Sequence, residues 1–228
     1  MILIQNKSDV AILEVSGDIV SNDYKFYKDD YGFDLTTPIE VKDFFKNNPD
    51  KEIRININSN GGDVFSGTAI ANMIKEHKGK TTAHIESIGA SIASVIAMAC
   101  DEVKMPKNAY LMIHKPWAYM GGNADDFEKT IELLNKIQNN IEEVYMSKVI
   151  NGIERKTITK LVNEETWLTG EEASKYFDIT LLDELKVLNC TSGIKYDNMP
   201  DFLLPKNEVK KVEIPKELKE KIEKLEKM

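Results

Sequence analysis

Apolar and polar positions alternate in two different rhythms along most of the chain. A period of two, typical of a strand with one buried face, runs through Ile53–Asn58. The apolar residues between Phe65 and His77 instead recur at helical spacing. The alternation then repeats, with a strand predicted over Thr81–Ile88 and a small-residue helix over Ser91–Ala99. Such repeats predict βαβ units, and therefore an α/β fold whose sheet is at least partly parallel.

The segments before this first strand predict three further elements. Val10–Val15 is an apolar run that reads as a strand and ends in a turn at Ser16–Asp18. The segment Asn22–Phe33 is polar and predicts a loop rather than a packed element. A short helix is expected from Thr37 to Phe45, because proline at position 38 suits the first turn of a helix.

The longest helical pattern follows two short predicted strands, Glu102–Met105 and Ala109–His114. Asp125 and Glu128 have capping-box spacing, so we expect them to begin this helix. Its apolar residues repeat at close to 3.5 residues, which is typical of a packing seam against the body or another subunit. They are Phe127, Ile131, Leu134, Ile137, Ile141 and Val144.

The composition of the chain changes near residue 188. We therefore expect a body, residues 1–187, and a charged tail, residues 188–228. The tail is turn-rich up to Pro200, and from Lys206 to Met228 it is mostly Lys and Glu. One thin apolar stripe in this last stretch leaves two interpretations open, a disordered tail or a short helix that pairs with something.

Composition and charge exclude several classes of function. The net charge of −8 argues against a general affinity for nucleic acid or anionic membranes. The longest apolar run, Ile92–Cys100, is too short to span a bilayer, and the first residues lack a secretion signal, so we expect a cytoplasmic protein. Cys100 and Cys190 have the spacing of neither a disulfide framework nor a zinc site. We expect no metal and no cofactor.

One serine stands among small residues where an apolar strand turns into a helix. Ser91 follows Gly89–Ala90 and would lie at a helix N-terminus, where the amide of Ile92 and the helix dipole favour a developing negative charge. Ser87 and Ser94 are poorer candidates for an attacking group, because they would lie inside the strand and inside the helix. The alternative for Ser91 is a small residue that only lets the helix pack closely.

Three histidines are available as a general base. His114 is the best placed, since it follows an apolar strand and precedes Lys115–Pro116, at a strand end where sites are commonly built. His77 has charged neighbours and suits the surface, while His84 lies within a strand. Gly61–Gly62 is either a simple turn or a close approach that presents a backbone amide to a substrate carbonyl.

Four segments of the body carry a resemblance to a known family. They are, in chain order, Ile57–Gly62, Gly89–Ala93, Met112–Pro116 and Thr166–Ala173. Together they resemble the Clp protease proteolytic subunit family over roughly Val10–Leu185. Two further segments make the chain more similar to the phage branch of that family, the Clp-like prohead or head-maturation proteases. These are Asn123–Ala124 and Glu165–Thr169.

The resemblance implies a serine peptidase. Ser91 would be its nucleophile and His114 its general base. The backbone amides of Gly62 and Ile92 would form the oxyanion hole. The third member of the triad would be Glu165, where Clp peptidases carry an aspartate, with the neighbouring residue 164, also a glutamate, as the alternative.

The resemblance also implies a fold, an assembly and a role. The fold is the Clp and crotonase-like α/β spiral, with a small core sheet and a long protruding handle helix from Asp125 to about Ile150. Homo-oligomeric rings are expected. They would cleave protein or peptide substrates, and the cleavage itself would not need ATP. The implied role is the processing of phage scaffold or capsid proteins during head maturation, in the host cytoplasm or the assembling prohead. Phage capsid, scaffold or portal proteins would be partners, but nucleic acid and membranes would not.

Three other functions stay open. A housekeeping Clp-type subunit would work with an ATP-driven unfoldase, although the polar segment 22–33 and the charged tail predict altered or missing contacts to an ATPase. An acyl-CoA enzyme of the crotonase family would share the fold but would need no nucleophilic Ser–His pair. A ring that only scaffolds assembly would not need the hydroxyl of Ser91.

Overall fold

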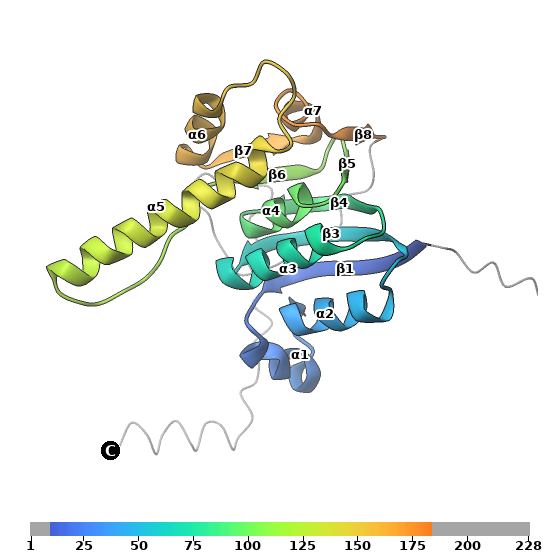
Figure 1. Ribbon diagram of the computed structural model, residues 1–228, viewed down its shortest axis with the longest axis horizontal. Helices are drawn as coiled ribbons and strands as arrows, with labels where there is room; N and C mark the ends of the chain where they lie inside the picture. Colours follow the sequence, from blue (N-terminus) through green and yellow to red (C-terminus); the bar gives the residue numbers. More distant parts are fainter. Residues whose placement is uncertain (1–9, 184–228) are drawn as a thin grey trace, which may run out of the picture.

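A mostly parallel sheet organises residues 10–183, which are the residues that this computed structural model describes (Figure 1). Its strands are β1 (Val10–Ile19), β2 (Leu35–Thr36), β3 (Glu52–Gly62), β4 (Thr81–Ala90), β5 (Glu102–Pro106), β6 (Tyr110–Ile113), β7 (Thr166–Thr169) and β8 (Thr180–Leu182). The main path runs β2-β1-β3-β4-β5-β8, and β6 pairs with β4 and with β7. Only the β6–β7 pair of this described sheet is antiparallel. The predicted α/β class with a partly parallel sheet is confirmed. The predicted tail lies outside the described residues.

Three helices, α2, α3 and α4, lie side by side on one face of this sheet (Figure 1). The helices are α1 (Lys25–Tyr31), α2 (Pro38–Asn47), α3 (Val64–Glu76), α4 (Ile92–Met98), α5 (Ala124–Met146), α6 (Arg155–Asn163) and α7 (Gly170–Ala173), with a 3₁₀ turn η1 at Asn22–Tyr24. In the described part of the chain, no helix combines the length and the apolarity needed to cross a membrane.

The core lies between the sheet and these helices. Ile53, Ile55 and Ile57 alternate along β3 and are completely buried, as the period of two predicts. Every residue of α4 is buried as well, which explains why this helix consists of small and apolar residues. A Cβ atom at Gly67 of α3 would collide with the side chain of Ile92, so glycine lets α3 and α4 approach closely.

β1 is longer than its apolar pattern predicts. The strand does not end after Val15 but continues to Ile19. The predicted turn at Ser16–Asp18 is a β-bulge, because the register with β3 shifts there and Gly17 has a φ of 63°. A Cβ atom at Gly17 would collide with the backbone carbonyl of Asp34, so only glycine fits this position.

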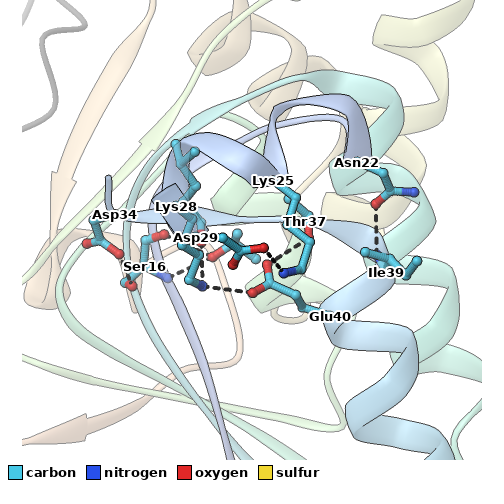
Figure 2. Close-up of polar contacts among 11 residues, drawn as sticks. Ser16, Asn22, Lys25, Lys28, Asp29, Asp34, Thr37, Ile39 and Glu40 are labelled. Carbon is cyan, nitrogen blue, oxygen red and sulfur yellow. Dashed lines mark hydrogen bonds and ion pairs between the residues drawn. The ribbon is translucent and has the colours of Figure 1, made fainter. Parts of the chain in front are cut away.

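The segment Asn22–Phe33 is helical, so the prediction of a loop was wrong. Lys25 and Asp29 stabilise α1 as an ion pair one turn apart, with 2.6 Å between Nζ and Oδ2 (Figure 2). Lys28 connects α1 to α2, since its Nζ lies 3.1 Å from Oε1 of Glu40. No residue of η1 or α1 is buried. The segment therefore lacks the apolar stripe by which helices are usually predicted.

The start of α5 also differs from the prediction. The predicted capping box of Asp125 and Glu128 is wrong, because the helix begins two residues earlier than that pair requires. The side chain of Asn123 accepts a hydrogen bond from the backbone N–H of Asp126, and the Asp126 carboxylate accepts one from the backbone N–H of Asn123. Asparagine is a preferred N-cap residue, and this box leaves Asp125 within the first turn.

The apolar seam of α5 packs against the body only along its second half. Ile141 and Tyr145 are buried there. The first half of the helix extends beyond the body, and its Phe127 and Ile131 side chains are 46% and 59% exposed (Figure 1). One helix therefore both completes the core and presents apolar side chains to solvent.

A buried carboxylate fastens the packed half of α5 to α6. Glu142 is 3% exposed and accepts hydrogen bonds from Gln138 Nε2 at 2.9 Å and from Thr159 Oγ1 at 2.6 Å. The guanidinium of Arg155 lies 3.8 Å from the same carboxylate. Since an unpaired buried charge is costly, these contacts restrict how the base of α5 sits on the body.

Candidate active site

Ser91 occupies the turn between β4 and α4. It is the N-cap residue of α4, with a φ of 55° and a ψ of −128°. A positive φ is uncommon for a residue other than glycine, and such backbone strain tends to occur at functional sites. The backbone N–H of Ser91 donates to the carbonyl oxygen of Met112 at 2.9 Å, which fastens this turn to β6.

His114 directly follows β6 and contacts this serine. β4 and β6 are parallel neighbours, with Ala90 opposite Met112, so the residues that follow the two strands emerge at the same edge of the sheet. His114 Nε2 lies 2.7 Å from Ser91 Oγ, within hydrogen-bonding distance. The structure thus brings together the two side chains that the sequence singled out as nucleophile and base.

Burial keeps the imidazole of His114 in the form that can accept a proton. The His114 side chain is 10% exposed, and burial lowers its pKa from the usual 6.5, against the opposing effect of the Glu165 carboxylate. A histidine with a lowered pKa is neutral near pH 7. In the tautomer whose Nδ1 carries the proton, Nε2 accepts the hydrogen of the Ser91 hydroxyl.

Glu165 is the carboxylate beside this histidine. Its Oε2 lies 4.0 Å from His114 Nδ1, close enough for an ion pair but longer than a direct hydrogen bond. Glu165 has a φ of 49°, so the turn before β7 is also strained. Glu164 is further from this role, because its side chain is 59% exposed and lies 3.9 Å from Lys160 Nζ. The geometry favours Glu165 over Glu164 as the acid.

The glycine pair at the end of β3 lies against the Ser91 turn. Gly61 and Gly62 have φ values of 98° and 146°. A Cβ atom at Gly61 would lie 2.7 Å from Ser91 Cβ, so the two backbones leave no room for a side chain there. β3 continues through this pair, so it is not a simple turn, and the close approach that the structure contains is between Gly61 and the Ser91 turn. Presentation of an amide to a substrate carbonyl stays a prediction.

Both residues whose amides the resemblance assigns to the oxyanion hole lie at the cleft. Ile92 is the first residue of α4, where an amide has no acceptor within its own helix. Gly62 and Ile92 both line the same cleft as Ser91 and His114. Preorganised N–H groups of this kind stabilise the negative charge of a tetrahedral intermediate.

The cleft has a volume of about 1250 Å³, more than the roughly 300–1,000 Å³ of most small-molecule pockets. Ser91, His114 and Glu165 line it, together with apolar residues from α3, from the segment after β6 and from α5. Trp117 and Tyr119 are 60% and 93% exposed, so their rings are accessible to a ligand. These dimensions suit a polypeptide segment with apolar side chains. The apolar lining residues include Val64, Phe65, Pro116, Trp117, Tyr119, Leu133, Leu134 and Ile137.

The other candidates from the sequence do not line this cleft. His77 Nε2 lies 2.7 Å from the carbonyl oxygen of Lys51. His84 is half-buried, and its burial and the positive charges of Arg54 and Lys104 lower its pKa to about 4. Within residues 10–183, no three His, Cys, Asp or Glu side chains gather in a way that would hold a metal ion.

The sequence does not identify Tyr145, a residue of α5 that contacts the site through α4. Its hydroxyl lies 2.7 Å from Ser94 Oγ, and Ser94 donates in turn to the carbonyl oxygen of Ser91. Tyr145 follows the last residue of the predicted apolar seam of α5 and is buried in the core, so nothing in its local pattern indicates a role at the site. The contact requires α5 to pack on α4, and no local signal predicts that.

Comparison with known proteins decides the family. Residues 44–183 match the family model described as Clp protease, which is more than half of the chain.

This chain belongs to the Clp protease family.

Members of the Clp protease family from three bacteria are similar to it. The chain is 31% identical over 151 residues to the ATP-dependent Clp protease proteolytic subunit 1 of Protochlamydia amoebophila, covering 64% of this chain and 70% of the relative. It is 30% identical over 140 residues to the subunit of the same name from Chlamydia abortus, covering 60% and 70%. For the ATP-dependent Clp protease proteolytic subunit of Deinococcus radiodurans, the identity is 28% over 132 residues, covering 57% and 63%. The chain is thus a Clp-type serine protease by family.

The acid limb of the pH profile tests the pairing of His114 with Glu165. Because the pKa of His114 is lowered, kcat/KM for a peptide substrate should fall with decreasing pH only below about 6.5. Glu165→Gln removes the charge that raises this pKa, so the acid limb should move to lower pH while kcat falls by about tenfold or more. Glu164→Gln is the control and should leave the limb in place. A limb that moves upward in Glu165→Gln would contradict the assignment.

A second prediction concerns the contact between the Gly61 and Ser91 backbones. Gly61→Ala places a methyl group 2.7 Å from Ser91 Cβ and should lower kcat/KM by about 100-fold, because small displacements of reacting groups are costly. Gly152→Ala is the matched control, since its φ of 92° is similar but no atom lies within 4 Å of the added Cβ. Equal activity losses in the two variants would show that backbone strain alone is responsible.

Proposed function

We propose that this protein is a serine endopeptidase in which Ser91 is the nucleophile and His114 the general base. The observation that carries the proposal is the 2.7 Å contact between Ser91 Oγ and His114 Nε2, at the wall of a cleft large enough for a polypeptide. Glu165 is proposed as the acid that orients the imidazole and stabilises its charged form. The site as proposed uses no metal and no cofactor.

The chemistry proceeds in two halves. In the first, His114 Nε2 takes the Ser91 proton while Ser91 Oγ attacks the substrate carbonyl carbon, and the oxyanion forms between the amides of Gly62 and Ile92. The imidazolium of His114 then protonates the departing amine, and the C–N bond breaks to leave an acyl-enzyme. In the second half, His114 removes a proton from water while the water oxygen attacks the ester carbonyl carbon. The bond between this carbon and Ser91 Oγ then breaks, His114 returns the proton to Ser91 Oγ, and the carboxylic acid product leaves.

The proposed substrates are phage scaffold or capsid proteins, cleaved without ATP during head maturation. Two segments support this narrower assignment, Asn123–Ala124 and Glu165–Thr169, which resemble the phage branch of the family. Portal, capsid or scaffold proteins are the proposed partners.

A housekeeping role is the second candidate function. The relatives are named as proteolytic subunits of ATP-dependent Clp proteases, and this observation favours a subunit that works with an ATP-driven unfoldase. The proposed triad would serve either role equally well.

We propose further that the chain assembles into homo-oligomeric rings through α5. The exposed half of this helix carries the apolar side chains Phe127, Ile131 and Leu133, which are unusual on a surface that faces only water. This half would be the handle of a Clp and crotonase-like spiral fold. The division into a body, residues 1–187, and a tail, residues 188–228, stays a prediction, as does the cytoplasmic location.

Labelling with a fluorophosphonate probe tests the proposed nucleophile. The probe should attach to Ser91 alone, because only a serine activated by a base reacts readily. Ser91→Ala should abolish labelling, and His114→Ala should slow it by about 100-fold or more. His77→Ala is the matched control and should label at the wild-type rate, since His77 does not line the cleft. The proposal would be refuted if folded wild-type protein were not labelled by the fluorophosphonate probe.

Cleavage assays distinguish the two candidate roles. Purified protein should cut the scaffold or capsid protein encoded beside its gene in the absence of ATP, with Ser91→Ala as the inactive control. Cleavage of casein that requires both ATP and a Clp ATPase would instead favour the housekeeping role.

A further inference from the structure

Two buried hydroxyl groups connect α5 to the backbone of Ser91. Ser94 is completely buried in α4, and Tyr145 of α5 is 1% exposed. Their oxygens lie 2.7 Å apart, although 51 residues separate them in the chain. Ser94 Oγ also donates to the carbonyl oxygen of Ser91 at 2.5 Å. The result is a continuous path of hydrogen bonds from the long helix to the proposed nucleophile.

The direction of these hydrogen bonds follows from counting protons. A serine hydroxyl has a single proton, and Ser94 uses it on the Ser91 carbonyl. The Tyr145 hydroxyl must therefore be the donor in its contact with Ser94 Oγ. Burial raises the pKa of Tyr145 above its usual value, so this phenol keeps its proton at neutral pH. The Ser94 backbone N–H adds a third bond by donating to the Ser91 carbonyl at 3.0 Å.

The carbonyl that accepts these bonds belongs to the same peptide unit as the Ile92 amide. A peptide unit is planar, and in its trans form the C=O and the N–H point in opposite directions. Hydrogen bonds that hold the Ser91 carbonyl toward Ser94 therefore also direct the Ile92 N–H away from it. Ile92 lines the cleft and provides one of the two proposed oxyanion donors. Its direction decides how well it reaches the developing charge.

The strained turn needs such support. Ser91 holds a φ of 55° that its side chain disfavours, and residues in this region persist only where their surroundings fix them. A serine hydroxyl that donates to a carbonyl three residues earlier is by itself an ordinary helical feature. Ser94 differs because a second buried hydroxyl, from another helix, also fixes its own position.

We propose that Ser94 and Tyr145 are positioning residues that orient the Ser91–Ile92 peptide and, through it, the oxyanion hole. This inference rests on the proposed function, since it deepens the role of the same site. The hydroxyl of Tyr145 acts through its hydrogen bond to Ser94, although the Tyr145 side chain also lines the cleft. The packing of α5 against the body thereby influences the orientation of the Ile92 amide, which is proposed to stabilise the oxyanion.

Steady-state kinetics on Ser94→Ala, Tyr145→Phe and the double variant test the inference with a peptide substrate. Ser94→Ala should lower kcat by about tenfold and Tyr145→Phe by roughly threefold, with KM changed less than about twofold, because the oxyanion exists only in the transition state. The double variant should match Ser94→Ala, because the hydroxyl that Tyr145→Phe removes is hydrogen-bonded to Ser94 Oγ. The affinity for a peptide aldehyde, whose adduct places an oxygen in the hole, should weaken by the same factors as kcat.

Two matched controls separate positioning from general packing. Ser147→Ala removes a hydroxyl that likewise donates to a carbonyl three residues earlier, that of Val144, but Ser147 is exposed at the C-cap of α5. Tyr176→Phe removes a phenol hydroxyl from a side chain packed against the core. Both should keep wild-type kcat. The acid limb of the pH profile should be unchanged in every variant, because His114 is not touched.

Four results would overturn the inference. They are an unchanged kcat in Ser94→Ala, a further loss when Tyr145→Phe is added to Ser94→Ala, a loss confined to KM, or a shifted acid limb. If a single variant fails to fold, the double variant still allows the test, because it removes both buried hydroxyls and leaves neither unpaired. If wild-type protein is not labelled by the fluorophosphonate, the proposed function fails and takes this inference with it. If labelling is normal and kcat does not respond, only the inference fails.

Discussion

Two stretches of backbone lie in direct contact at the centre of the site, and the arrangement of the groups around them depends on this contact. The end of β3 at Gly61 lies so close to the turn at Ser91 that a single methyl group would not fit between them. Ser91 accepts a positive φ there, and its backbone N–H is bonded to Met112 of β6. The same β6 delivers His114 to the serine. The alignment of three strands therefore sets the position of the proposed nucleophile, its base and both amides.

Opposing electrostatic effects then set the chemistry of the base. Burial favours neutral His114, whereas the Glu165 carboxylate 4.0 Å away favours the charged form, and burial prevails. A base that is neutral at rest but has a carboxylate nearby suits a reaction in which the imidazole becomes charged only transiently. α5 adds a further constraint, since its packed half is fixed by Glu142 and contacts the site through Tyr145. Its exposed half leaves the body, so one helix connects the site to the surface proposed for assembly.

Much of the fold is predicted correctly where one local pattern dominates. The alternation of Ile53–Asn58 and the helical spacing after it identified β3 and α3, because a buried face repeats along each element. The helix within 22–33 was missed, since it buries nothing and depends on an ion pair, an i,i+4 contact that leaves no apolar period. The N-cap of α5 was predicted two residues too late. Both Asn123–Asp126 and Asp125–Glu128 have capping-box spacing, and only the helix geometry shows that Asn123 is the N-cap.

The positions of Ser91 and His114 directly after apolar strands could be predicted from local sequence, because the end of an apolar run is visible in a few neighbouring residues. The 2.7 Å distance between their side chains depends on the pairing of β4 with β6, which brings together two segments that are separate in the chain. The choice of Glu165 over its neighbour likewise required the turn before β7. The hydrogen bond between Tyr145 and Ser94 could not be predicted from any local sequence pattern. It joins residues of two helices whose packing is a property of the whole core, which no short segment encodes alone.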